Sequence, residues 1–137
     1  MDVRMEHTQG LGRLAEVWVD GELLRVCDNL SSADRRCPPG VIGECRFIYT
    51  CEAGTDWTEA RRLNPGRKQR LEPLQRWSYI GFGRVTAIMP VVVDFGLLTM
   101  EDASWTTDES LIGQYVAIQI DRLDITHPGS DWPATLR

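Results

Sequence analysis

"GRVTAIMPVVVDFG", residues 83–96, is the stretch of the sequence that decides the fold class. After Gly83, apolar and polar residues alternate, and a continuous apolar run, residues 91–93, follows Pro90. Alternation is the period of a strand with one buried face, and β-branched runs build strands that are buried on both faces. Pro90 lacks a backbone donor, so we expect it at an edge, a bulge or a turn. The stretch predicts two strands of a β-rich domain, with the valines in its core.

The length and composition of the chain are those of one domain of common size. The chain has 137 residues, and its 7 prolines and 12 glycines separate short elements, with no heptad pattern or long helical stretch. No run of about 18 apolar residues occurs, and the N-terminus lacks the apolar core of a signal peptide. We therefore expect a single, mainly β domain over residues 1–137, cytoplasmic and without a membrane segment.

Short strands can be placed along the chain. Residues 13–28 alternate on both sides of Asp20 and Gly21, a pair that accommodates the positive φ angles of a tight hairpin. Further strands are predicted at residues 41–49, 79–89, 91–100 and 114–125. The segment 126–137 contains prolines and is expected to be a frayed tail.

Two short helices and one long connection are expected between these strands. Asp56 caps the first helix, with Glu59 three residues later, and Thr106 with Glu109 has the same capping-box spacing for the second. Residues 64–77 are polar, basic and twice interrupted by proline. We expect a long connection there.

The two halves of the chain show a weak similarity. The intervals from Gly12 to Gly43 and from Gly83 to Gly113 are 31 and 30 residues. Many β-hairpins begin with a glycine followed by alternation, so two interpretations stay open. One is an internal repeat of residues 12–50 and 83–121, and the other is a shared local pattern.

Residues 83–120 resemble part of the OB-fold barrels, in which a helix lies between the third and fourth strands and a glycine commonly opens a curling strand. The residues that carry the resemblance are Gly83, Val85, Ile88, Val93, Asp94, Phe95, Gly96, Gly113, Gln114, Tyr115 and Val116. It implies a small antiparallel, OB-like β-barrel for at least the second half. Oligonucleotide-binding members interleave aromatic and basic residues on the central strands, whereas residues 83–100 offer only Arg84 and Phe95. The resemblance therefore favours a barrel wall over an oligonucleotide face.

Residues suited to catalysis or metal binding are sparse. The four cysteines, at positions 27, 37, 45 and 51, lack the close paired spacing of a zinc site, so we expect free thiols, no metal and no cofactor. His7 and His127 are expected in exposed loops without a catalytic partner. The sequence contains no nucleophile elbow and no phosphate-binding glycine loop. An enzyme is the least favoured class, and no catalytic residue is assigned.

The strongest charge anomaly is the stretch 61–76, which we call the basic connection. It carries six cations against Glu72 alone, a net of +5 in a chain whose net charge is −5. With aromatic residues beside it, this segment is suited to the phosphates and bases of a single strand, with strong salt dependence. The candidate nucleic-acid-binding residues are Arg61, Arg62, Arg67, Lys68, Arg70, Arg76 and Trp77. The alternative is a solvated loop that neutralises acidic neighbours.

The C-terminal part of the chain is acidic. From Asp94 onward eight carboxylates stand against two arginines, and the segment "MEDASWTTDES" sets a tryptophan among carboxylates. An aromatic anchor with a charged rim suits a protein partner, particularly a basic one. The candidate protein-binding residues are Trp105, Glu101, Asp102, Asp108 and Glu109. Ordinary solubility is the alternative.

Between the two kinds of partner, the sequence favours protein. The acidic net charge disfavours general attraction to nucleic acid or to an anionic membrane, and the basic residues are confined to one connection. We expect a non-enzymatic protein-interaction module of the adaptor, inhibitor or immunity type. Single-stranded nucleic acid is the alternative ligand and an enzyme the third class. The sequence leaves the identity of the partner and the oligomeric state open.

Overall fold

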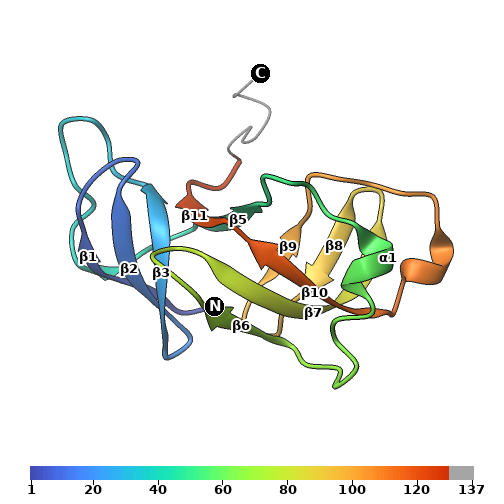
Figure 1. Cartoon of the computed structure of the whole chain (residues 1–137). Helices are drawn as coiled ribbons and strands as arrows, with labels where there is room; N and C mark the ends of the chain where they lie inside the picture. Colours follow the sequence, from blue (N-terminus) through green and yellow to red (C-terminus); the bar gives the residue numbers. More distant parts are fainter. Residues whose placement is uncertain (130–137) are drawn as a thin grey trace. The chain divides into compact units, whose positions relative to one another are not determined.

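The structure is a computed structural model that describes residues 1–129 (Figure 1). Most of the predicted tail, residues 130–137, lies outside the described residues. The chain divides into two compact units. Within the described residues, the first unit is Met1–Ile48 together with residues 123–129, and the second unit is Tyr49–Arg122. The internal repeat of residues 12–50 and 83–121 stays a prediction.

The first unit contains most of a six-stranded sheet with the order β4-β1-β2-β3-β11-β5. Its strands are β1 (Val3–Thr8), β2 (Leu14–Val19), β3 (Glu22–Asn29), β4 (Gly40–Val41), β5 (Arg46–Thr50) and β11 (Arg122–Thr126). β2 is antiparallel to both β1 and β3, and β11 is parallel to β3. Alternate residues of β2 are fully buried, as its sequence pattern predicts.

The hairpin predicted at Asp20 and Gly21 is confirmed. These residues join β2 to β3 with φ angles of 46° and 87°, the left-handed values that a two-residue hairpin turn needs. The strand β1 was not predicted. Its alternate residues Val3 and Met5 are buried, so the segment that the sequence left irregular is the neighbour of β2.

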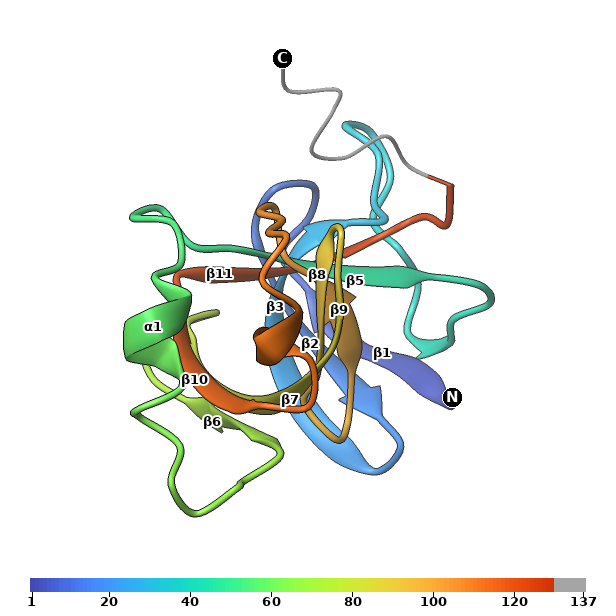
Figure 2. The ribbon, with the colours of Figure 1, turned by 90° about the vertical axis from the view of Figure 1, so that its right-hand side faces the viewer.

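The second unit contains the other sheet, with the order β10-β7-β8-β9 and β6 also paired with β7. Its strands are β6 (Arg70–Pro73), β7 (Tyr79–Ile88), β8 (Val91–Asp94), β9 (Thr99–Glu101) and β10 (Tyr115–Ile120). All of these pairs are antiparallel. The helix α1 (Trp57–Ala60) lies beside β10 (Figure 1, Figure 2).

The strand β7 is the centre of this sheet, and it curves as it changes partners (Figure 2). β10 pairs with residues 79–84 along one edge, while β6 pairs with residues 79–82 and β8 with residues 84–88 along the other. A Cβ at Gly83 would come within 2.7 Å of the carbonyl oxygen of Asp94. Glycine is needed there because the backbone of β8 approaches so closely.

The core of the second unit lies on one face of β7 and β8. Val91 and Val93 are fully buried, which confirms the core prediction for them, whereas Val92 is half-buried on the other face. Phe95 is also fully buried and packs edge-to-face against Tyr49, with ring centroids 5.8 Å apart. Phe95 is therefore a core residue and does not lie on a ligand-binding face.

The mainly β, mostly antiparallel character of the chain is confirmed, but the predicted closed barrel is wrong. Within residues 1–129 the strands form two sheets, and no barrel closes. Two segments that were predicted as single strands are divided. Residues 91–100 form β8 and β9 around a turn at Gly96, and residues 114–125 break at Asp121 into β10 and β11, which belong to different sheets. The strand period is the same on both sides of each break, so alternation did not reveal it.

The prediction of two short helices is not borne out, because α1 is the lone α-helix of the described residues. Asp56 caps α1 as expected, since its carboxylate accepts hydrogen bonds from the N–H groups of Thr58 and Glu59. The second site is a single 3-10 turn, η1 (Glu109–Leu111), capped by Asp108. No helix in the described part of the chain is long and apolar enough to cross a membrane.

Candidate functional site

A buried carboxylate, Asp102, organises the backbone after β9. It is 6% exposed, and its Oδ2 accepts hydrogen bonds from the hydroxyls of Tyr49 (2.7 Å) and Thr55 (3.2 Å). Its Oδ1 accepts from the N–H (2.9 Å) and hydroxyl (2.6 Å) of Ser104, and Ser104 Oγ accepts from the indole N–H of Trp57 at 3.1 Å. We call these five residues the Asp102 framework. The sequence grouped Asp102 with the protein-binding residues, but the structure places it inside the fold, where its oxygens bind the framework.

Trp105 follows this framework directly and is 70% exposed. The carbonyl of Ser104, on one side, accepts a hydrogen bond from the N–H of Val91 at 3.1 Å. The N–H of Thr106, on the other side, donates to the carbonyl of Ile88 at 2.9 Å. Trp105 therefore projects from a backbone that is bonded on both sides, and little backbone freedom remains to be lost on binding.

Two further apolar residues lie across from Trp105. Met89 and Pro90 form the turn between β7 and β8, and the two backbone bonds at residues 104 and 106 bracket this turn. Met89 is 62% exposed, and Pro90 is exposed as well. We call Met89, Pro90 and Trp105 the Trp105 surface. Single exposed apolar residues are ordinary, whereas a cluster of them marks a place of contact.

The other predicted protein-binding residues flank Trp105 in the chain. Glu101, Asp108 and Glu109 are all exposed. Asp108 lies 3.5 Å from Arg61, an exposed pair of small energetic weight. Hydrogen bonds from the hydroxyl and N–H of Ser110 lower the pKa of Asp108, so this carboxylate is charged at neutral pH.

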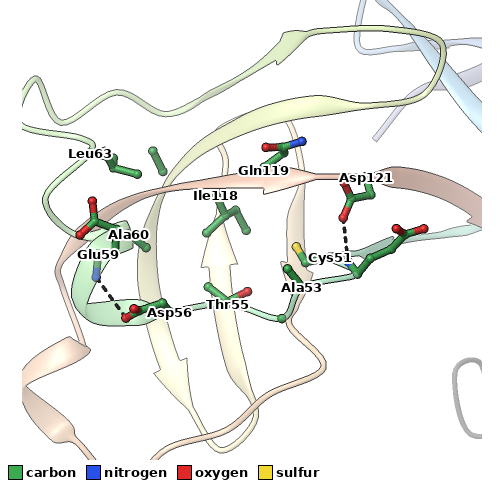
Figure 3. A pocket seen from close by; sticks show the side chains of 13 residues that line it. Cys51, Ala53, Thr55, Asp56, Glu59, Ala60, Leu63, Ile118, Gln119 and Asp121 are labelled. Atoms are coloured by element: carbon green, nitrogen blue, oxygen red, sulfur yellow. Dashed lines mark hydrogen bonds between the residues drawn. The ribbon is translucent and has the colours of Figure 1, made fainter.

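A hollow of about 330 Å³ lies between α1, residues 51–56 and β10 (Figure 3). Its titratable lining is acidic apart from one thiol. The four carboxylates are those of Glu52, Asp56, Glu59 and Asp121. Two of them already have structural roles, because Asp56 caps α1 and Asp121 accepts the N–H of Glu52 at 2.7 Å, both drawn as dashed lines in Figure 3. This acidic hollow adds negative potential to the second unit.

The thiol of Cys51 lines this hollow and also a second one of about 250 Å³ that reaches Ala103 and Ser104. Burial raises the pKa of the Cys51 thiol to about 12, and the charge of Asp102 adds to the effect. Burial also raises the pKa values of Cys37 and Cys45. All three thiols are protonated at neutral pH, and a protonated thiol is a weak nucleophile.

The basic connection is attached to the sheet by Asn64, which is 3% exposed. Its Nδ2 donates to the carbonyls of Val116 and Lys68, each at 3.0 Å, and its Oδ1 accepts from the N–H of Lys68 at 2.8 Å. These bonds close residues 64–68 into a turn against β10. Arg67 adopts φ of 52°, a left-handed value that costs a non-glycine residue free energy.

Three predicted nucleic-acid-binding residues, Arg67, Lys68 and Arg70, meet the outer face of the sheet. The Lys68 ammonium lies 4.9 Å from the ring centroid of Phe82, and the Arg67 guanidinium lies 5.8 Å from that of Tyr115. In the strand register Arg70 is opposite Phe82, and Arg84 is opposite Tyr115. Directly opposed residues share a face of a sheet. We call this set the basic-aromatic face: Arg67, Lys68, Arg70, Phe82, Arg84 and Tyr115.

The remaining predicted nucleic-acid-binding residues lie elsewhere on the second unit. Arg61 is next to Asp108, and Arg62 is exposed in the turn after α1. Arg76 stacks on the ring of Trp77 at 3.9 Å, in the turn between β6 and β7. The structure thus divides the predicted set of seven between the face and two separate turns.

Phe82 and Tyr115 were missed by the sequence analysis, which asked only whether residues 83–100 alternate aromatic and basic residues along one strand. The structure assembles such residues across β6, β7 and β10 instead. Phe82 and Arg84, two residues apart on β7, were a usable signal, because residues at this spacing share a face of a strand. Tyr115 joins them only through the pairing of β10 with β7.

Neither histidine lies at these surfaces. His7 is exposed, but it belongs to β1 and not to an irregular segment. The Nε2 of His127 is 3.1 Å from the carbonyl oxygen of Leu30, and since that oxygen can only accept, Nε2 is the donor.

Comparisons with protein-family models, with curated proteins and with solved structures gave no match to this chain. Function therefore has to be argued from the side chains of these surfaces.

Proposed function

We propose that the protein is a non-enzymatic interaction module that binds a protein partner through the Trp105 surface. The observation that carries this proposal is the 70% exposure of Trp105 on a backbone that is hydrogen-bonded on both sides. Tryptophan is enriched among the residues that dominate binding energy at interfaces. A preordered anchor also loses less entropy on binding than a mobile one.

A recess lined by the two residues that precede Trp105 in the chain supports the same proposal. The hollow of about 250 Å³ is lined by Ala103 and Ser104, which immediately precede Trp105, and by three residues of the Asp102 framework besides Ser104. A partner side chain can enter this recess while the indole contacts the neighbouring part of the partner. A projecting aromatic residue beside a recess is the arrangement in which anchors of two proteins fill one another's pockets.

The charges around Trp105 favour a basic partner. Glu101, Asp108 and Glu109 are exposed near it in the chain, and the acidic hollow lies on the same unit. Complementary charge mainly speeds encounter and selects among partners, so binding should weaken as salt is raised.

Comparative affinity capture tests the proposal. Wild-type protein, Trp105→Ala and the control Leu74→Ala serve as baits, because Leu74 is also an exposed apolar residue of the second unit, at 49%. A partner bound by wild type and by the control is expected to lose about tenfold or more in affinity for Trp105→Ala when measured with purified proteins. If the captured proteins and their affinities are the same for all three baits, the proposal is wrong.

A further inference from the structure

The basic-aromatic face is not part of the Trp105 surface, and its side chains suit a different ligand. We propose that this face binds single-stranded nucleic acid. Phe82 and Tyr115 stack bases, and the four cations, Arg67, Lys68, Arg70 and Arg84, bind the phosphates. The ligand class follows from the combination of half-buried aromatic rings on the outer face of the sheet with closely placed cations.

The face is positive in an acidic protein. It carries the four cations Arg67, Lys68, Arg70 and Arg84. The strand register also places three carboxylates on this face, Glu72, Asp94 and Glu101, which leaves a local net charge of +1. Glu72 is 3.8 Å from Lys68 and also accepts hydrogen bonds from Arg70. These are exposed ion pairs of small net energy, so phosphate oxygens can replace the carboxylate.

The two rings are covered by cations that a ligand can displace. Phe82 and Tyr115 are both half-buried, beneath Lys68 and Arg67 respectively. A cation–π contact at a solvent-accessible site is weak. An incoming strand can therefore place a base on each ring while the displaced cations move to the adjacent phosphates. At each ring, the ligand thus exchanges one weak cation–π contact for a base stacked on the ring and a charge-assisted hydrogen bond between the cation and a phosphate.

The turn that carries two of the cations is preorganised. Asn64 closes residues 64–68 by two hydrogen bonds with the backbone of Lys68, and it fixes the turn to β10 by one to the carbonyl of Val116. Arg67 is held at a φ of 52° within this turn. A left-handed conformation of a non-glycine residue persists only where the surrounding structure enforces it, and such positions cluster at functional sites.

Nucleic acid is favoured over an acidic peptide because of the rings. An acidic peptide offers carboxylates to the cations, but it has no flat ring in each repeat for Phe82 and Tyr115. A single strand supplies both groups in alternation, and its bases are free to stack because they are unpaired. A duplex hides its base faces and would contact the cations alone.

Fluorescence anisotropy with two matched ligands tests the proposal. The ligands are a labelled oligothymidylate of about 12 nucleotides and an abasic oligomer with the same number of phosphates. The wild-type protein is expected to bind the oligothymidylate at least about fivefold more tightly, since stacking on either ring adds affinity. Four neutralised phosphates predict a loss of about fiftyfold in affinity between about 50 and 200 mM salt.

Variants separate stacking from charge. Phe82→Leu and Tyr115→Leu keep an apolar side chain but remove the ring, so each should weaken oligothymidylate binding and leave abasic binding within twofold, an expectation set at roughly the scatter of such titrations. Arg67→Gly should weaken the binding of both ligands, since it removes a cation from a position whose backbone conformation glycine tolerates. Thermal melting of each variant confirms folding. Arg62→Ala, an exposed arginine of the same connection that lies off the face, is the matched control and should change neither affinity.

Three results would overturn the proposal. One is equal affinity of wild type for the abasic and base-containing strands, which would show a polyanion surface only. Another is tighter binding of polyglutamate than of oligothymidylate, which would point to an acidic protein. The third is the absence of saturable binding at low salt. None of these results bears on the Trp105 surface, whose test uses a protein partner.

Discussion

The Trp105 surface and the basic-aromatic face both present aromatic rings on the second unit, but they are held in different ways. Trp105 is largely exposed, and the residue before it, Ser104, is held by a buried carboxylate that accepts four hydrogen bonds. Phe82 and Tyr115 are half-buried, and their positions come from strand register and from cations laid over them. An exposed indole is suited to contact with apolar groups of a partner. A ring covered by a cation is suited to a ligand whose anionic groups can bind that cation.

At both surfaces, some residues hold the backbone in place and other residues are available to contact a ligand. Asp102 and Asn64 are buried polar residues whose side chains hold backbone in place. Trp105 and Arg67 lie next to these supports; the Trp105 side chain is largely exposed, and the Arg67 guanidinium lies over the ring of Tyr115. Substitution of a support should lower stability, while substitution of a surface residue should change binding alone.

The largest effect is expected for Asp102→Ala, which leaves the Tyr49 hydroxyl and the Ser104 groups without their acceptor. Orphaned buried donors are expensive, and we expect the free energy of unfolding to fall by about 3 kcal/mol. Urea denaturation measures the change, and Glu52→Ala, an exposed carboxylate of the same unit, should stay within about 0.5 kcal/mol. Equal stability of the two variants would contradict the structural role of Asp102.

Asn64→Ala is the corresponding test of the basic-aromatic face. It removes three hydrogen bonds made by a buried side chain, so unfolding should become easier by about 2 kcal/mol. Gln69→Ala removes a single exposed bond to the carbonyl of Asp94 and should cost about 0.5 kcal/mol. A smaller loss for Asn64→Ala than for Gln69→Ala would mean that the turn is not anchored to β10.

The reactivity of the Cys51 thiol tests whether the residues around Asp102 shield this thiol from solvent. Because its pKa is raised to about 12, little thiolate exists at pH 8, and alkylation should be more than about tenfold slower than in an unfolded peptide. Asp102→Ala removes a negative charge that favours the thiol, so the pKa should fall and the reaction should accelerate. Iodoacetamide kinetics resolved by peptide mass spectrometry measure both rates. A fast reaction of Cys51 in the wild type would show that the thiol is accessible and that the Asp102 framework does not shield it.

Arg67→Gly should show whether the left-handed backbone conformation at Arg67 costs more free energy than the contacts of its side chain contribute. Glycine tolerates a φ of 52°, so we expect stability within about 1 kcal/mol of wild type and above that of Arg67→Ala, which keeps the Cβ in the left-handed region. Thermal melting of both variants gives the order. A less stable glycine variant would show that the Arg67 side chain contributes more than its strain costs.

The smallest effect on stability is expected for Trp105→Ala, within about 0.5 kcal/mol, because the side chain is largely exposed. Trp57→Ala, which removes the indole donor to Ser104, should cost clearly more. Chemical denaturation of both variants gives the comparison. A large loss for Trp105→Ala would mean that the indole packs on the protein instead of facing solvent.

Local sequence pattern predicted elements whose cause is local. The hairpin at Asp20 and Gly21, the cap at Asp56 and the strand character of residues 79–89 follow from turn chemistry, capping and alternation. For the candidate sites, the sequence shows a tryptophan among carboxylates at Trp105, and the structure adds that this side chain is exposed; its role in binding stays a prediction.

The residues that sequence analysis misplaced depend on contacts between distant segments. The sequence analysis placed Asp102 in an acidic rim, but its carboxylate is buried. The hydroxyls that donate hydrogen bonds to its Oδ2 come from Tyr49 and Thr55, about fifty residues earlier in the chain. Tyr115 carried no signal, because its neighbours on the basic-aromatic face come from β7 and from the basic connection.

The sequence by itself determined the mainly β class, the tight hairpin, the capped helix and the separation of positive from negative charge along the chain. Each of these depends on residues within a few positions of one another. Only the tertiary structure decided that the strands form two sheets, that residues 114–125 divide between them, and that cations of a connection lie over rings of two strands. The physical reason is that strand pairing and burial are set by long-range contacts, and the alternation along one strand does not say which strand will lie beside it.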